Sequence, residues 1–182
     1  MEFTNAMVKY GQMNQNLIKY LDQFENLGGI FDAAKDQRVA VMAREHPSDS
    51  KCLYGGETAK RMQFTSPYVF DFSKNKTLRD LMATLSWGES WGIWYDSVHS
   101  IEERRAAFRR HHMTELPDQR KVYLRFFDPR IFPTFFEHCE AEERHDFAKG
   151  VRQFLLESEH AKNRVLTYKL NQGKFVKSEA DF

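Results

Sequence analysis

The sequence has few cysteines and no long apolar run. Its two cysteines, Cys52 and Cys139, are far apart and fit neither a C-x-x-C motif nor a disulfide framework. We interpret both as core thiols of a protein in a reducing compartment. No stretch approaches the roughly 18 apolar residues of a membrane-spanning helix, and the first thirty residues lack the apolar run of a signal peptide. These absences predict a cytoplasmic protein with no membrane partner.

The sequence also lacks an excess of either charge. Lys and Arg number 27 and Asp and Glu number 26, so no overall field attracts the chain to phosphate backbones. We therefore expect no nucleic-acid partner. Apolar side chains, in contrast, are abundant: 41% of the residues are hydrophobic and 16 are Phe, which excludes a disordered chain. A chain of 182 residues can bury a core of its own.

Strand and helix patterns alternate along most of the chain. Short apolar runs at 27–33, 68–72 and 91–96 indicate strands, and amphipathic segments follow them. The run at 122–127 is apolar on both faces, which is typical of a central strand between two helix layers. The alternation predicts an α/β fold with a mixed, largely parallel central sheet flanked by helices.

The C-terminal part has a different pattern. Three short strand patterns follow one another without helices, at 151–156, 164–170 and 174–177. The sequence Asn171-Gln172-Gly173 joins the last two as a hairpin turn. We therefore predict an α/β domain over residues 1–149 and a short C-terminal β extension over residues 150–182, a small β-meander packed on that domain.

One motif points to catalysis. Residues Gly88 to Gly92 read G-x-S-x-G, the nucleophile elbow of α/β hydrolases, and Asp128 and His138 follow in the order acid, then histidine. However, that elbow requires a strand before its serine and a helix after it, whereas here a helix pattern precedes Ser90 and a strand pattern follows. A small serine hydrolase using Ser90 is the alternative function, and a binding protein without catalytic residues is the preferred one.

A second motif points to metal binding. His138, Glu142 and His145 recur at spacings of four and three on one helical face. The segment is rich in charges and has no third His or Cys at metal-ligand spacing, so we interpret it as a solvated face. We expect neither a metal site nor a bound cofactor.

Arginines gather on one predicted helix. Ser100-Ile101-Glu102-Glu103 is a capping box that opens a helix reaching to about Met113, and this helix has a thin apolar face and a basic stripe that includes Arg110. The C-terminal strands carry several aromatic side chains. We predict that the contacts with a partner protein come from these two regions, through Arg104, Arg105, Phe108, Arg109, Phe154, Tyr168 and Phe175.

Arg125 interrupts the apolar pattern of the predicted strand at 122–127. An unpaired guanidinium at such a position is costly, so Arg125 should pair with a carboxylate. The candidates stand near strand ends and are Asp32, Asp71, Asp96 and Asp128. We interpret the pair as structural and expect its loss to cost on the order of 3 to 5 kcal/mol if Arg125 is buried.

Five segments of the chain form a recognisable series. They are IFDAAK at 30–35, CLYGG at 52–56, SPYV at 66–69, WGIW at 91–94 and RFFDPR at 125–130, the last being the most specific. In order and spacing they resemble the type VI secretion effector chaperones, adaptors built on domain of unknown function 4123. The signature residues are Asp32, Tyr54, Pro67, Arg125, Asp128, Pro129 and Arg130.

The resemblance implies an adaptor and not an enzyme. Members of this family hold one secreted effector protein and help to load it on the valine-glycine-repeat spike protein. Two features depart from the family: only three predicted strands follow Gly150, and Pro133 interrupts the helix after the signature strand.

Overall fold

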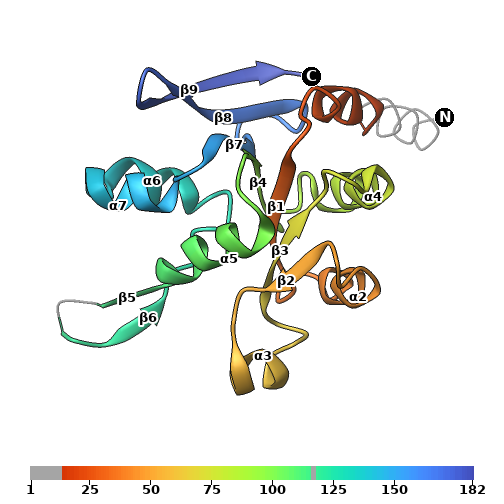
Figure 1. The fold of residues 1–182 in the computed structure, drawn as a ribbon. Coiled ribbons are helices and arrows are strands. Elements are labelled where there is room, and N and C mark those ends of the chain that lie inside the picture. Colours follow the sequence, from red (N-terminus) through yellow and green to blue (C-terminus); the bar gives the residue numbers. More distant parts are fainter. Residues whose placement is uncertain (1–13, 116–117) are drawn as a thin grey trace.

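The computed structural model describes residues 14–115 and 118–182 (Figure 1). A helix over residues 14–21 comes first. In chain order it is followed by β1 (Leu27–Asp32), α2 (Arg38–Glu45), β2 (Ser50–Cys52), α3 (Gly56–Arg61), β3 (Pro67–Asp71), α4 (Lys76–Ser86), β4 (Gly92–Ser97), α5 (Ile101–Arg110), β5 (Met113–Glu115), β6 (Lys121–Tyr123), α6 (Phe132–His138), α7 (Ala141–Phe147), β7 (Val151–Glu157), β8 (Arg164–Asn171) and β9 (Lys174–Asp181).

Seven strands form one sheet in the order β2-β3-β1-β4-β7-β8-β9, and every neighbouring pair is antiparallel. The fold is therefore mixed α/β, but the prediction of a largely parallel sheet is wrong. The strands β3 and β4 do run in the same direction and are joined through α4, as the alternation predicted. However, β1 lies between them, with Ile30 opposite Val69 on one side and opposite Ile93 on the other.

The prediction of a central strand at 122–127 is also wrong. Only β6 is a strand, and it pairs with β5 in a separate two-stranded sheet. Tyr123 is 52% exposed, whereas Phe126 and Phe127 are buried in a turn beyond the strand. The backbone N–H of Asp128 donates to the carbonyl of Arg125 (2.9 Å) and closes that turn. An apolar run can thus be buried by a turn under helices as well as by a sheet.

The three C-terminal strands are present where the sequence predicted them, and they extend the same sheet. Strand β7 pairs with β4, with Trp94 opposite Leu155. A two-residue turn at Gln172 and Gly173 joins β8 to β9. Both residues have positive φ (47° and 80°), which suits the right-handed twist of a tight hairpin.

Apolar side chains fill both faces of the sheet. On one face, Phe31, Phe70 and Trp94 pack under the helix at 14–21, α2 and α4. On the other face, Phe108 of α5 and Phe147 of α7 join a cluster of aromatic rings under α5, α6 and α7. Figure 1 shows these two helix layers on opposite sides of the sheet. The sheet therefore lies in the middle of a three-layer arrangement.

The capping box that the sequence predicted at the start of α5 is confirmed. Ser100 Oγ accepts a hydrogen bond from the backbone N–H of Glu103 (3.3 Å), and the Glu103 carboxylate accepts one from the backbone N–H of Ser100 (2.9 Å). These bonds satisfy two donors at the helix start and fix the position of α5 after β4.

Candidate functional site

The signature residues meet at one end of the sheet, although they are spread over most of the chain. Strand β1 ends at Asp32, which lies opposite Pro67, the first residue of β3. The backbone N–H of Asp32 donates to the carbonyl of Trp91, just before β4 (2.8 Å). The Arg125 side chain reaches the same point and donates to the Asp32 carboxylate. We call this region the signature end of the sheet.

Asp32 is the partner of Arg125 among the four acids that the sequence offered. Its carboxylate is buried and also accepts a hydrogen bond from the backbone N–H of Ala34 (2.9 Å). Burial raises the pKa of the Asp32 carboxyl, and the nearby charge of Arg125 acts in the opposite direction. Arg125 itself is 42% exposed and lies outside any strand. The condition of a buried arginine is therefore not met, and the expected loss of 3 to 5 kcal/mol, which depended on it, does not apply.

Asp128 organises the loop that follows. Its carboxylate accepts hydrogen bonds from the backbone N–H of Arg130 (3.1 Å) and from the guanidinium of the same residue (2.8 and 2.6 Å). Lys35 Nζ lies 3.8 Å from the same carboxylate. Burial raises the pKa of Asp128, but the bonds from Arg130 outweigh it and hold the pKa below its usual value. This bonding fixes the backbone at the buried Pro129 and holds the side chain of Arg130, which is half exposed.

Tyr54 lies on the same end of the sheet, beside the β5–β6 hairpin. Its ring packs against His112 and Tyr123, with centroid distances of 5.7 and 5.5 Å. Arg105 of α5 donates to the carbonyl of Tyr54 (2.7 Å) and to that of Cys52. Burial raises the pKa of Tyr54 to about 12. Tyr54 therefore stays neutral and joins the hairpin to the signature end.

A cavity of about 530 Å³ opens beside Pro129 and Arg130. We call it the signature cavity, and its lining residues are Gly88, Ser90, Pro129, Arg130, Glu157, Ser158, Glu159, His160, Ala161 and Lys162. The lining combines acidic, basic and hydroxyl groups with the apolar faces of proline and alanine. Such a hollow can receive a protruding side chain of a partner protein.

Glu157, at the end of β7, was not singled out by the sequence. Its carboxylate accepts hydrogen bonds from the backbone N–H of Gly88 and from both the hydroxyl and the backbone N–H of Ser90. Burial raises the pKa of the Glu157 carboxyl. Gly88 and Ser90 both have positive φ (84° and 55°), so Glu157 holds a tight turn in place. No local sequence pattern indicates this role of Glu157, because the turn lies almost seventy residues before it in the sequence.

The G-x-S-x-G motif does not form a nucleophile elbow. Helix α4 precedes Ser90 and strand β4 follows it, which is the reverse of the order that the elbow needs. Ser90 donates to Glu157, while Asp128 pairs with Arg130 and His138 bonds the Thr134 carbonyl. The acid and the histidine that followed Ser90 in the sequence are thus engaged elsewhere.

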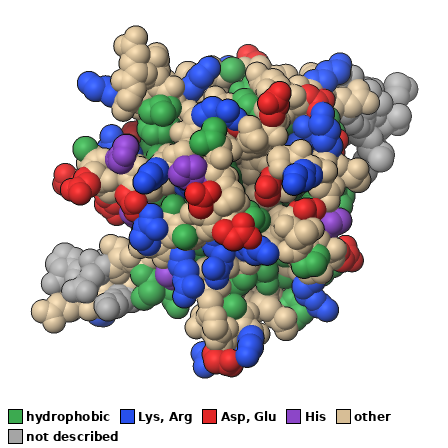
Figure 2. Space-filling view, in the orientation of Figure 1, with side chains coloured by type: hydrophobic (Ala, Val, Ile, Leu, Met, Phe, Trp, Pro, Cys, Tyr) green, Lys and Arg blue, Asp and Glu red, His purple; other side chains and the backbone are tan. Residues whose placement is uncertain are grey.

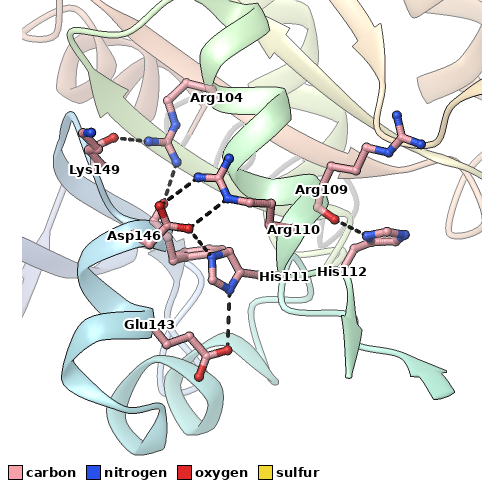
Figure 3. Close-up of polar contacts among 9 residues, drawn as sticks. Arg104, Arg109, Arg110, His111, His112, Glu143, Asp146 and Lys149 are labelled. Carbon is pink, nitrogen blue, oxygen red and sulfur yellow. Dashed lines mark hydrogen bonds and ion pairs between the residues drawn. The ribbon is translucent and has the colours of Figure 1, made fainter. Parts of the chain in front are cut away.

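The arginines of α5 have separate roles (Figure 3). Arg104 is buried and donates to the carbonyl of Phe147 (2.7 Å) and to that of Lys149, so it ties α5 to the end of α7. Burial lowers its pKa to about 10. Arg110 forms two hydrogen bonds with Asp146 of α7, both 2.9 Å long. Arg104, Arg105 and Arg110 of the basic stripe are thus all engaged in contacts within the chain.

Three of the aromatic residues predicted to contact a partner are also in the core. Phe108, Phe154 and Tyr168 are buried, and Tyr168 donates its hydroxyl to Glu137 (2.5 Å). Because they are buried, they cannot contact a partner protein. The sequence did not reveal this, since apolar periodicity is the same for a face in the core and for a face that binds a partner. Phe175 is half-buried, and Arg109 is exposed. These two side chains remain accessible.

The three residues that suggested metal binding do not share one helix. His138 ends α6, whereas Glu142 and His145 belong to α7. Within residues 14–115 and 118–182, no three His, Cys, Asp or Glu side chains are grouped so that they could hold a metal ion. The same part of the chain contains no helix that is long and apolar enough to span a membrane. Figure 2 shows acidic and basic side chains mixed over the visible face.

Comparison with known proteins gives one match. The model of a protein family described as "Domain of unknown function (DUF4123)" matches residues 30–146. This range includes all five segments of the signature series. No curated protein and no solved structure matches the chain.

Proposed function

The chain belongs to the DUF4123 family, and from this premise we propose that it is a cytoplasmic adaptor for a type VI secretion effector. In this proposal the chain binds the effector protein and helps to load it on the valine-glycine-repeat spike protein, and it has no catalytic activity. The observation that carries the proposal is the convergence of the signature residues at one end of the sheet, beside the signature cavity.

The contacts at this end favour recognition of a protein. The bonds between Asp32 and Arg125 and between Asp128 and Arg130 fix the loop that borders the signature cavity. A surface that is already ordered loses less conformational entropy when a partner binds. Arg130 remains 55% exposed while it is held by Asp128, so its guanidinium can also bond a partner.

The proposal can be tested by filling the cavity. Ala161 lines the cavity, and Ala161→Trp puts a large side chain into it. Ala106, exposed on α5 and outside the cavity lining, gives the matched variant Ala106→Trp. Candidate effector and spike proteins from the genome that encodes this chain are co-expressed with each variant and captured through the adaptor. We expect Ala106→Trp to retain the complex and Ala161→Trp to lose most of it, with equal melting temperatures.

Two results would contradict the proposal. Equal capture by both variants would show that the signature cavity does not contact the effector. A folded wild-type protein that captures neither the effector nor the spike protein, and that hydrolyses a generic ester in a manner abolished by Ser90→Ala, would establish the hydrolase instead.

A further inference from the structure

Strand β9 is the outermost strand of the large sheet. It pairs with β8 on one side, and no strand among residues 14–115 and 118–182 pairs with its other side. Nearly all of its residues are exposed, and Figure 1 shows the strand running along the margin of the molecule. The strand has eight residues without proline and without a bulge. Of the devices that usually block an open edge, the strand has neither a proline nor a bulge, and only its charged side chains remain.

The hydrogen-bonding groups on the open side can be identified from the ladder. The backbone N–H of Phe182 donates to the carbonyl of Asn163 on the β8 side (3.1 Å). Backbone groups alternate between the two sides of an antiparallel strand. Those of Ala180, Ser178 and Val176 therefore also face β8. The N–H and C=O groups that face outward belong to Phe175, Lys177, Glu179 and Asp181.

The charges of β9 change sign along the strand. Lys174 and Lys177 lie in its first half, and Glu179 and Asp181 lie in its second half. An antiparallel copy of the same strand presents these charges in the opposite order. The strand is therefore complementary to itself.

We propose that β9 pairs with β9 of a second copy of this chain, in antiparallel register about Ser178, and so joins two sheets into one. The outward groups of both strands then bond each other, with Lys177 opposite Glu179 of the second copy. By symmetry this pair occurs twice. The partner is thus identified by charge complementarity and by the alternation of the backbone groups, independently of the adaptor function.

The charges also select this register. A shift of two residues keeps the backbone groups in phase, but it places Lys177 opposite Lys177 in one direction and Glu179 opposite Glu179 in the other. Like charges directly opposite each other destabilise a strand pair. Among these three registers, only the one about Ser178 keeps these two residues from meeting their own copies.

The side chains on both faces of the strand fit this arrangement. Lys177 Nζ lies 2.8 Å from a Glu137 oxygen of α6, and an ammonium has three donors, so it can also reach the Glu179 of the second copy. On the other face, Val176 is 51% exposed and lies opposite Ala180 of the second copy. The pairing therefore covers an exposed apolar side chain.

The dimer is expected to be weak and to depend on concentration. One strand pair buries less surface than a stable protein interface, so its affinity rests on the backbone bonds and the charge pairs. Exposed charge pairs lose strength as salt increases. The fraction of dimer should rise with protein concentration and fall with added salt.

The test uses two charge reversals and their mixture, in sedimentation velocity from micromolar to near-millimolar concentration. Lys177→Glu makes both cross-strand pairs acidic, and Glu179→Lys makes both basic. We expect each variant alone to raise the dimer dissociation constant by about tenfold or more. An equal mixture of the two restores opposite charges in both pairs and should form a heterodimer. Recovery of the dimer in the mixture shows that each reversal acted on the pairing between chains, because a change within one chain would persist in the mixture.

Two further variants serve as controls. Lys174→Glu reverses a charge that lies opposite Phe182 in this register and should leave the dimer unchanged. Glu179→Pro removes an N–H that faces outward while it keeps the bonds to β8, so it should give a folded monomer. The inference is overturned by a wild-type protein that is monomeric at every concentration, by a dimer that Glu179→Pro does not affect, or by two reversed variants that fail to associate. A monomer whose effector binding is lost in Glu179→Pro would show that a strand of the effector occupies this edge.

Discussion

Arg125 donates a hydrogen bond to Asp32 across 93 positions of sequence, and this bond joins the loop after β6 to the end of β1. The two residues differ in their surroundings, since Asp32 is buried and Arg125 is half exposed. Asp32 also bonds the backbone of Ala34, and its own backbone bonds Trp91. The pair therefore fixes the place where strands β1, β3 and β4 meet the loop after β6.

The exposure of Arg125 determines the effect of its removal. Arg125→Ala leaves the Asp32 carboxylate without its charged partner, but water can reach the vacated position and Asp32 keeps the bond from Ala34. We expect the free energy of unfolding to fall by about 1 to 2 kcal/mol. Arg120, whose pair with Asp118 is on the surface, provides the control, and Arg120→Ala should change the value by at most about 0.5 kcal/mol. Urea denaturation of both variants measures the difference, and equal effects would contradict it.

Arg104 should matter more to stability than any exposed arginine of α5. Arg104→Ala opens a void beneath α5 and leaves the carbonyls of Phe147 and Lys149 without their donor, at a cost of about 3 kcal/mol or more. Arg109, on the exposed face of the same helix, gives the matched variant Arg109→Ala with a loss near zero. Thermal unfolding compares the two. A larger loss for Arg109→Ala would mean that α5 packs differently.

The link between α5 and α7 should weaken in acid. A hydrogen bond from Arg110 holds the pKa of Asp146 below its usual value, and His111 contributes through a second contact of 3.1 Å. Since the unfolded chain binds this proton more readily, the contribution of Asp146 is present above its unfolded pKa of about 3.9 and is lost as pH falls through the lower folded value. Asp146→Asn should therefore reduce stability near neutral pH and flatten its decline in acid. The free energy of unfolding is measured from about pH 6 to about pH 2.5, a range that spans this titration. An unchanged acid slope would contradict it.

Gly92 should tolerate no side chain. A Cβ at this position would lie 2.0 Å from the carbonyl oxygen of Ile30 and 2.8 Å from the Cα of Phe31, both backbone atoms of the neighbouring strand. Gly92→Ala must therefore separate β4 from β1, and we expect a loss of about 3 kcal/mol. Ile93→Val, at the next residue, removes one methyl group and should cost about 1 kcal/mol. Melting temperatures distinguish the two, and equal values would show that the strands can separate freely.

The sequence by itself determined the elements whose signals are local. Short apolar runs placed β1, β3 and β4 to within a residue or two, the Ser100 capping box placed the start of α5, and the turn at Gln172 and Gly173 placed the C-terminal hairpin. The signature series also placed the chain among its relatives. Side-chain periodicity and turn chemistry depend on residues that are close in sequence, so they can be read before the chain is folded.

Only the tertiary structure decided which strands are neighbours and which side chains are accessible. Strand β1 lies between β3 and β4, and this made the sheet antiparallel. The apolar residues after Tyr123, which predicted a central strand, form a turn instead. Burial of Arg104 and the bond of Glu157 to the turn at Ser90 likewise depend on residues far away in sequence. Such contacts are stabilised by packing in the core between residues that are far apart in sequence. A local sequence pattern does not identify which distant residue will be the partner.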